Sequence, residues 1–301
     1  MADFTAKDVQ ALREATGIGM MECKKALTEA NGDFEAAVTI LRERGLASHE
    51  KKAGRVTAEG IVSIVIEENI GVIIEVNSET DFVAKNEDFR AFVNLVATTV
   101  IKDNPKDIDE LLACKAGDQV IDDILKEKVF TIGENLRIRR FERYEGVLIP
   151  YIHGGGTHAV IVKFDTSDEV ASKDEFVAFG KDIAMQIAAA NPTYLSKDFI
   201  PSTDIEQERA ILLSQALNEG KPQNIAEKMV EGRINKFYKD VVLLEQPFVK
   251  DDKITVAQYI ANTAKALGDD IKVVAFTRYE KGEGLEKRSD NFAEEVASMQ
   301  K

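Results

Sequence analysis

The sequence Asn-Ser-Glu-Thr-Asp-Phe-Val-Ala-Lys at residues 77–85 lies between a predicted strand and a predicted helix. The preceding run, 72–76, has the apolar and β-branched content of a strand. Asn86 can cap the helix that follows, on which five apolar residues recur at helical spacing: Phe89, Phe92, Val93, Val96 and Val100. Residues 80–83 are therefore expected at an exposed corner. A large aromatic residue beside a carboxylate is unusual there, because loop tips are usually small and polar, and binding residues collect on such loops.

Two interpretations of Phe82 are open: its ring folds back under the helix as a cap on the core, or it contacts a partner. A comparison within the chain helps to choose between these interpretations. Two segments about 87 residues apart contain the same predicted elements in the same order, as in a duplicated subdomain. The first corner carries Thr-Asp-Phe at 80–82, and the second carries Ser-Asp-Glu at 167–169. The fold therefore does not need an aromatic side chain at the corner, which favours the contact with a partner.

The composition predicts a globular chain with two or three domains: 301 residues, 44% hydrophobic and 31% charged. A net charge of −14 is a poor match for a nucleic-acid backbone and suits a protein partner. No run approaches the roughly 20 apolar residues of a membrane span. Cys23 and Cys114 lie far apart without CxxC spacing, which favours reduced thiols and a cytoplasmic location.

The N-terminal part predicts a small helical module. Its helices are expected at 5–15, 20–30 and 33–43. Gly45 should end the third helix, and a charged linker should follow at 48–56. Three short helices bury little surface, so Ile18, Met20 and Met21 are candidates for exposed apolar contacts. The alternative for either methionine is that it fills the small core.

The middle of the chain predicts a helical excursion at 101–130 and a strand at 136–144 that is rich in arginine. This strand either contacts nucleic acid or forms a solvated sheet face that balances nearby acids. The interleaved acids and the negative net charge favour the second interpretation.

The C-terminal half predicts a helical hairpin at 204–217 and 223–238, joined by Gly220-Lys221-Pro222. The apolar residues expected to pack its helices together are Ile205, Leu212, Leu213, Leu217, Ile225, Met229, Ile234 and Phe237. The other expected elements are a capping box of Ser172 with Glu175, strands at 241–244 and 271–279, a turn at 246–248, a helix at 256–267 and a short amphipathic run at 292–296.

The residue inventory offers little for catalysis or for a cofactor. The glycines at 154–156 precede a strand rather than a helix, so they indicate a hairpin turn and not a phosphate cradle. His153 and His158 flank this turn, but no further ligands are in view to complete a metal site. Asp81 alone is weak evidence for a general acid or base. We therefore expect no enzyme activity, no cofactor and no metal of the protein's own.

Several long motifs, spread over the whole chain in order, resemble the bacterial elongation factor Ts family. They are Gly-Met-Met-Glu-Cys-Lys-Lys-Ala-Leu at 19–27, Glu-Val-Asn-Ser-Glu-Thr-Asp-Phe-Val-Ala at 75–84, Ile-Gly-Glu-Asn at 132–135, Gly-Lys-Pro at 220–222, Ile-Ala-Glu-Lys-Met-Val-Glu-Gly-Arg at 225–233 and Gln-Pro-Phe at 246–248. The resemblance implies a translation factor that promotes guanine-nucleotide exchange on elongation factor Tu.

The resemblance also implies the site residues. The corner would reach the magnesium and phosphate site of elongation factor Tu, which assigns partner contacts to Thr80, Asp81, Phe82 and Val83. The N-terminal module of the family touches the GTPase domain, which adds Arg13, Met20 and Met21. Lys52 and His153 match further family contacts.

The fold implied by the resemblance is α+β with four parts. These are a three-helix module of the ubiquitin-associated type at 1–54, a first core subdomain at 55–143, a second at 144–280 that includes the helical hairpin 204–238, and a C-terminal helical module at 281–301. Two other classes stay open: a helical adaptor that binds peptides or ubiquitin-like partners through the first module, and a hydrolase that uses Asp81.

Overall fold

The structure is a computed structural model that describes residues 4–286, and it divides into two compact units. Among the described residues, the first unit combines 4–65 with 74–143 and 280–286; the second combines 66–73 with 144–279. Helices and three-stranded sheets together make the fold α+β, as predicted. The amphipathic run expected at 292–296 lies outside the described residues.

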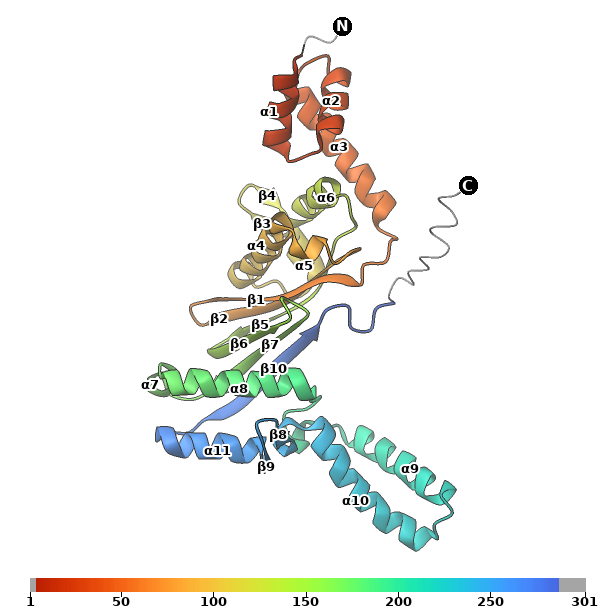
Figure 1. Cartoon of the computed structure of the whole chain (residues 1–301), viewed down its shortest axis with the longest axis vertical. Coiled ribbons are helices and arrows are strands. Elements are labelled where there is room, and N and C mark those ends of the chain that lie inside the picture. The colour runs from red at the N-terminus through yellow and green to blue at the C-terminus, as the bar shows by residue number, and fades with distance from the viewer. Residues whose placement is uncertain (1–3, 287–301) are drawn as a thin grey trace. The chain divides into compact units, whose positions relative to one another are not determined.

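The first unit begins with three helices around a small apolar core: α1 (Ala6–Thr16), α2 (Met20–Glu29) and α3 (Phe34–Lys52) (Figure 1). The backbone N–H of Thr5 donates to the Asp8 carboxylate at 2.6 Å, so α1 begins as its sequence predicts. Ile18 is buried in the core, and its predicted exposure is therefore wrong.

Helix α3 is longer than predicted, because it continues through Gly45 and ends at Lys52. The predicted helix stop at Gly45 and the predicted linker from residue 48 are both wrong. A Cβ atom on Gly45 would lie 3.7 Å from Cβ of Phe130, which is on α6 (Ile121–Ile132) and also packs against the three-helix core. Packing against α6 thus outweighs the cost of about 1 kcal/mol that glycine brings to a helix.

The sheet of the first unit has the order β1-β2-β5, and the α4–α6 helices lie over one of its faces (Figure 1). Its elements are β1 (Glu59–Glu67), β2 (Ile70–Ser78), α4 (Glu87–Asp103), α5 (Ile108–Ala113) and β5 (Arg137–Glu145). The predicted apolar stripe of α4 is buried throughout. The excursion at 101–130 is mainly helical, but it also contains a small hairpin that was not predicted, β3 (Lys115–Ala116) with β4 (Gln119–Val120).

Glu75 on β2 is fully buried, with 0% exposure, and its carboxylate collects four donors. They are an Nη of Arg139 at 3.0 Å, Nε of Arg140 at 2.6 Å, Nδ2 of Asn77 at 3.0 Å and the backbone N–H of Gly282 at 2.8 Å. The arginines of β5 therefore balance an acid, as the favoured interpretation expected, but the acid is buried rather than solvated. A buried charge is tolerated only with such partners.

Gly60 on β1 permits a close approach to β2. Its φ is +115°, and a Cβ atom there would lie 2.2 Å from the carbonyl oxygen of Val76. We expect Gly60→Ala to lower the free energy of unfolding by about 1–3 kcal/mol, because alanine is strained in that backbone conformation. Thermal unfolding followed by circular dichroism measures this loss. Gly54→Ala is the matched control, since nothing lies within 4 Å of its Cβ position; equal stability of the two variants would contradict the prediction.

The second unit has a sheet of order β10-β7-β6, with α8 packed on β6 and β7 (Figure 1). Its elements are β6 (Val147–His153), β7 (His158–Asp165), α7 (Asp168–Ala171), α8 (Asp174–Ala190), α11 (Val256–Leu267) and β10 (Lys272–Glu280). The rings of Phe164, Phe176 and Phe179 pack together in its core. The predicted capping box is wrong: the Ser172 hydroxyl donates to the carbonyl of Glu169 instead, at 2.9 Å.

The predictions for 241–248 are also wrong. Helix α10 reaches Val241, and a 3-10 turn, η3 (Leu243–Glu245), stands where a strand was expected. The expected turn at 246–248 leads into the short strand β8 (Pro247–Phe248), paired with β9 (Asp251–Thr255). The Phe248 ring stacks on Tyr259 of α11 with centroids 4.1 Å apart. The local sequence does not predict this tertiary contact.

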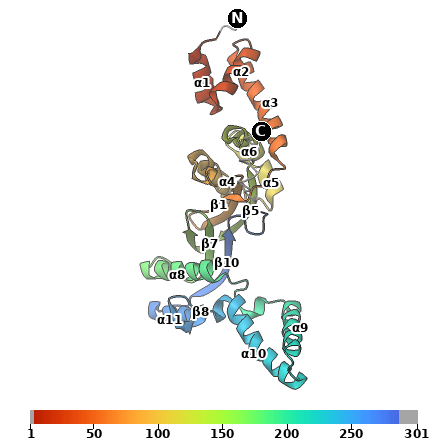
Figure 2. The ribbon, with the colours of Figure 1, turned by 45° about the vertical axis from the view of Figure 1, so that its right-hand side comes forward.

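A short 3-10 turn, η2 (Lys197–Phe199), precedes the predicted helical hairpin, which consists of α9 (Ser202–Asn218) and α10 (Gln223–Val241) (Figure 2). The two helices meet through small and β-branched side chains: Ala216, Ala226, Val230 and Ile234 are buried. Leu217 and Ile225, which were expected to pack between the helices, are exposed next to the turn.

The duplicated order of elements is present in both units. Helices α4 and α8 each follow a strand hairpin and a corner, and each has 17 residues. Each helix ends at an asparagine in left-handed conformation, Asn104 with φ +51° and Asn191 with φ +45°. The two corners differ, because the second contains α7 and the first contains the 3-10 turn η1 (Val83–Lys85).

Candidate partner-binding site

The corner between β2 and α4 exposes one aromatic ring. Strand β2 ends at Ser78, and Asn86 begins α4 by accepting the backbone N–H of Asp88 at 2.8 Å. Between them, Phe82 is 77% exposed, whereas the next residue, Val83, is only 7% exposed. Phe82 is therefore not a cap on the core. Val83 anchors the corner from below and offers little surface to a partner.

The neighbours of Phe82 are charged and also exposed. Asp81 and Lys85 form an ion pair at 3.8 Å, and Nζ of Lys85 lies 5.8 Å from the centroid of the Phe82 ring. Such exposed contacts contribute little stability, roughly 0–1 kcal/mol each. A partner can therefore replace them at low cost. We call residues 80–83 the tip.

The base of the tip is held by a carboxylate distant in sequence. Oε2 of Glu134 accepts the backbone N–H groups of Glu79 at 3.1 Å and of Thr80 at 2.9 Å, and Oε1 accepts the Thr80 hydroxyl at 2.6 Å. The Ser78 hydroxyl donates to the carbonyl oxygen of Thr80 at 2.9 Å. The backbone that enters the tip is thus fixed by charge-assisted hydrogen bonds, which are stronger than those between neutral groups.

The arrangement is reciprocal. Oε1 of Glu79 accepts the backbone N–H of Asn135 at 2.7 Å and also pairs with Arg55 at 3.3 Å. The side-chain amide of Asn135 donates to the carbonyl oxygen of Arg55, with Nδ2 at 3.1 Å. Each loop therefore supplies a carboxylate to the backbone of the other. We call the bonds of the Glu79 and Glu134 carboxylates the loop latch.

Lys52, the last residue of α3, is half-buried beside the loop latch. Its Nζ donates to the carbonyl oxygen of Val129 at 3.2 Å. Burial lowers the pKa of this ammonium and Arg55 lowers it further, while the charges of Glu79 and Glu134 act in the opposite direction. In this conformation Lys52 tethers the end of α3 to α6.

The remaining predicted residues of the first unit lie in the N-terminal helical module. Arg13 is exposed near the end of α1. Met20 and Met21 begin α2 and are 45% and 64% exposed, so neither fills the small core. The two methionines give the module exposed apolar side chains that can adapt to a partner.

His153 lies in the second unit, at the end of β6 and in register with His158 on β7. It is exposed, and its Nδ1 lies 3.3 Å from the Tyr151 hydroxyl, with the two rings stacked. Over residues 4–286, no three His, Cys, Asp or Glu side chains come together as a metal site.

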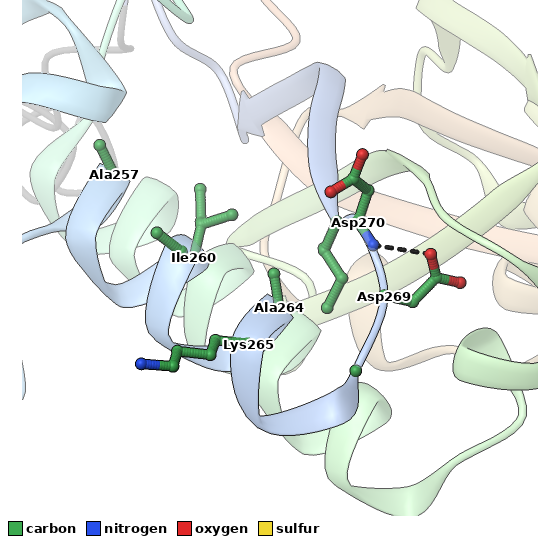
Figure 3. A pocket seen from close by; sticks show the side chains of 9 residues that line it. Ala257, Ile260, Ala264, Lys265, Asp269 and Asp270 are labelled. Atoms are coloured by element: carbon green, nitrogen blue, oxygen red, sulfur yellow. Dashed lines mark hydrogen bonds between the residues drawn. The ribbon is translucent and has the colours of Figure 1, made fainter.

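A hollow of about 710 Å³ along α11 does not resemble a ligand site. Ala257, Ile260 and Ala264 occupy one face of the helix there (Figure 3). The polar side chains of this hollow are exposed, and the Asp269 carboxylate is bonded to the backbone N–H of Asp270 at 2.7 Å. A ligand pocket needs polar groups that converge on an enclosed space, so the exposed tip is a better candidate for function than this hollow.

The family model described as Elongation factor TS matches residues 79–283. The chain belongs to the elongation factor Ts family. A protein named Elongation factor Ts from Clostridioides difficile is 50% identical over the full length of both chains. Those from Clostridium perfringens and Symbiobacterium thermophilum are each 49% identical over 98% of this chain, covering 99% and 98% of their own lengths.

Membership of the elongation factor Ts family makes the chain a translation elongation factor. The region matched by the family model includes the tip, Glu134 and His153, whereas Arg13, Met20, Met21 and Lys52 precede it and are covered by the full-length relatives. In the described part of the chain, no helix combines the length and the apolarity of a membrane span.

Sequence reasoning missed the roles of Glu79 and Glu134. Both stand in motifs that resemble the family, at 75–84 and 132–135, but nothing in either motif indicates that they bond to each other's loops. The contacts join residues 54 to 56 positions apart. The only local signal is a carboxylate followed by a polar residue in a loop next to a strand, which occurs at many surface positions.

Proposed function

We propose that the chain is a guanine-nucleotide exchange factor that binds elongation factor Tu carrying GDP, disturbs its magnesium and phosphate site, and promotes release of GDP. The observation that carries this proposal is the exposure of Phe82 on a braced corner. An exposed aromatic ring on a fixed backbone has large apolar area to bury and little conformational freedom to lose on binding.

The proposed mechanism is a linkage between two ligands of one GTPase. A GTPase holds its nucleotide through Mg²⁺, a lysine and backbone N–H groups. This chain should bind the nucleotide-free partner most tightly. By linkage, GDP then lowers the partner's affinity for this chain by the same factor by which this chain lowers the partner's affinity for GDP. Phe82 acts as a wedge whose burial contributes about 1.5–3 kcal/mol. Asp81 brings a negative charge near the Mg²⁺ ligands.

The contact surface extends beyond the tip. Arg13, Met20 and Met21 offer a second contact from the N-terminal module, and His153 a third from the second unit. Several contacts are needed, because ordinary coupling of about 1–3 kcal/mol is too small to displace a Mg²⁺-bound nucleotide. Val83 supports Phe82 from below, and Lys52 holds α3 on α6. No covalent bond changes in this mechanism, so the chain acts as an exchange factor and not as an enzyme.

The proposal also includes the domain division implied by the family: a helical module at 1–54, core subdomains at 55–143 and 144–280, with the hairpin 204–238 in the second, and a C-terminal module at 281–301. The two compact units support the border near 143. Function in translation elongation implies a cytoplasmic location.

Stopped-flow mixing with elongation factor Tu that carries a fluorescent GDP analogue tests this function. The expected result is a release rate that rises with the concentration of the chain and then saturates, while excess GDP dissociates the complex. Binding without faster release would overturn the exchange function and would support the adaptor alternative.

A further inference from the structure

The loop latch supports only one of the two corners. At the first corner, the Glu134 carboxylate takes three donors from residues 79 and 80, immediately before Phe82. At the second corner, the Ser167 hydroxyl accepts the backbone N–H of Val170 at 3.3 Å, and α7 follows at once. The Asp269 carboxylate also hydrogen-bonds with the Ser167 side chain there. What distinguishes the first corner is that its distant carboxylate binds the backbone N–H groups just before an exposed aromatic ring.

We propose that Glu134 is a positioning residue for Phe82, holding the tip in the conformation that enters the partner. This inference rests on the proposed exchange function. Glu134 fixes the backbone on the strand side of the tip. On the helix side, the Phe82 carbonyl accepts the N–H of Lys85 at 3.1 Å, and the buried side chain of Val83 anchors the turn. With both sides fixed, the backbone that carries the Phe82 ring is held in one conformation.

The energetic reason is preorganisation. Without Glu134, the N–H groups of residues 79 and 80 would bond to water, and the segment before Phe82 would gain backbone freedom. Binding would then have to restore the order before the ring could act as a wedge. The effect of Glu134 should therefore appear in the rate of nucleotide release within the complex, more than in the formation of the complex through the other contacts.

Glu134→Gln is the sharpest variant. A glutamine has the same shape but no charge and only one acceptor oxygen. It therefore cannot accept all three hydrogen bonds, and those that it keeps are not charge-assisted. The matched control is Glu110→Gln, because the Glu110 carboxylate also accepts a backbone N–H, that of Lys106 at 2.7 Å, in another loop of the same unit.

Three measurements on the full chain test the inference. In the stopped-flow assay, we expect Glu134→Gln to lower the maximal rate of GDP release about tenfold, because hydrogen bonds to a charged group are lost. The half-saturating concentration should change less than the rate, and Glu110→Gln should behave like the wild type. Hydrogen exchange should show faster exchange of the amides of residues 79 and 80 in Glu134→Gln, at an unchanged melting temperature.

The third measurement is a double-mutant cycle with Phe82→Ala. If Glu134 acts through the ring, adding Glu134→Gln to Phe82→Ala should slow release by no more than about twofold. Additive losses would overturn the positioning role, and so would wild-type release by Glu134→Gln. A wild-type chain that fails to accelerate GDP release would overturn the proposed function itself. Acceleration by the wild type with no effect of Glu134→Gln would overturn only this inference.

Discussion

Phe82→Ala is expected to lower the stimulated rate of GDP release roughly 10- to 100-fold and to leave the fold intact. The ring is 77% exposed, so its removal deletes almost no internal packing. In the complex, the same ring would bury apolar area worth about 1.5–3 kcal/mol, and each 1.4 kcal/mol corresponds to a factor of ten. Stopped-flow release of labelled GDP from elongation factor Tu measures the loss directly.

Two controls make this result specific. Phe199→Ala removes another exposed phenylalanine ring, 62% exposed, from the second unit. Glu169→Ala alters the residue that corresponds to Phe82 at the second corner. Both variants should release GDP at nearly the wild-type rate. An undiminished rate for Phe82→Ala would rule out the wedge, and a large loss for Glu169→Ala would mean that both corners act on the nucleotide site.

Glu75→Ala is expected to have the largest effect on stability, lowering the free energy of unfolding by about 3–5 kcal/mol. The substitution leaves Arg139 and Arg140 without their common carboxylate, and it leaves the N–H of Gly282 without the acceptor that it has at 2.8 Å. Breaking a buried charge cluster is costly because the remaining groups have already been removed from water.

Urea unfolding of the full chain, followed by circular dichroism, measures this change. Glu29→Ala is the control, because the ion pair of Glu29 with Arg44 at 2.6 Å is exposed and belongs to the same unit. It should change stability by less than about 1 kcal/mol. A Glu75→Ala protein as stable as Glu29→Ala would show that the buried cluster contributes no more than a surface ion pair.

The parts of the fold that sequence predicts are those with a local physical signal. The apolar spacing of α4, the cap at Asn86 and the Thr5 start of α1 each depend on neighbours within a few residues, and each is present. The errors lie where tertiary contacts decide. Gly45 continues a helix because α6 packs on it, and Phe248 extends a strand because Tyr259 stacks on its ring.

The same division applies to the candidate site. The exposure of Phe82 follows from the sequence alone, because the second corner shows that the fold can do without an aromatic ring there. The small size of a three-helix core indicates that some apolar residues are exposed but not which ones: Met20 and Met21 are exposed, whereas Ile18 is buried. The loop latch does not follow, since a carboxylate gives no local indication of which backbone it will bond 54 residues away.

The division of the chain into units has a practical consequence for dissecting this protein. The polypeptide passes between the units at 65/66, 73/74, 143/144 and 279/280. A fragment that ends near 143 would lose the Gly282 donor of Glu75, and a fragment that begins there would lose the hairpin end at 66–73. No single proteolytic cut liberates a complete half of the molecule. Deletion variants would therefore have damaged sheets, and the contribution of each surface is best assigned by single substitutions in the intact polypeptide.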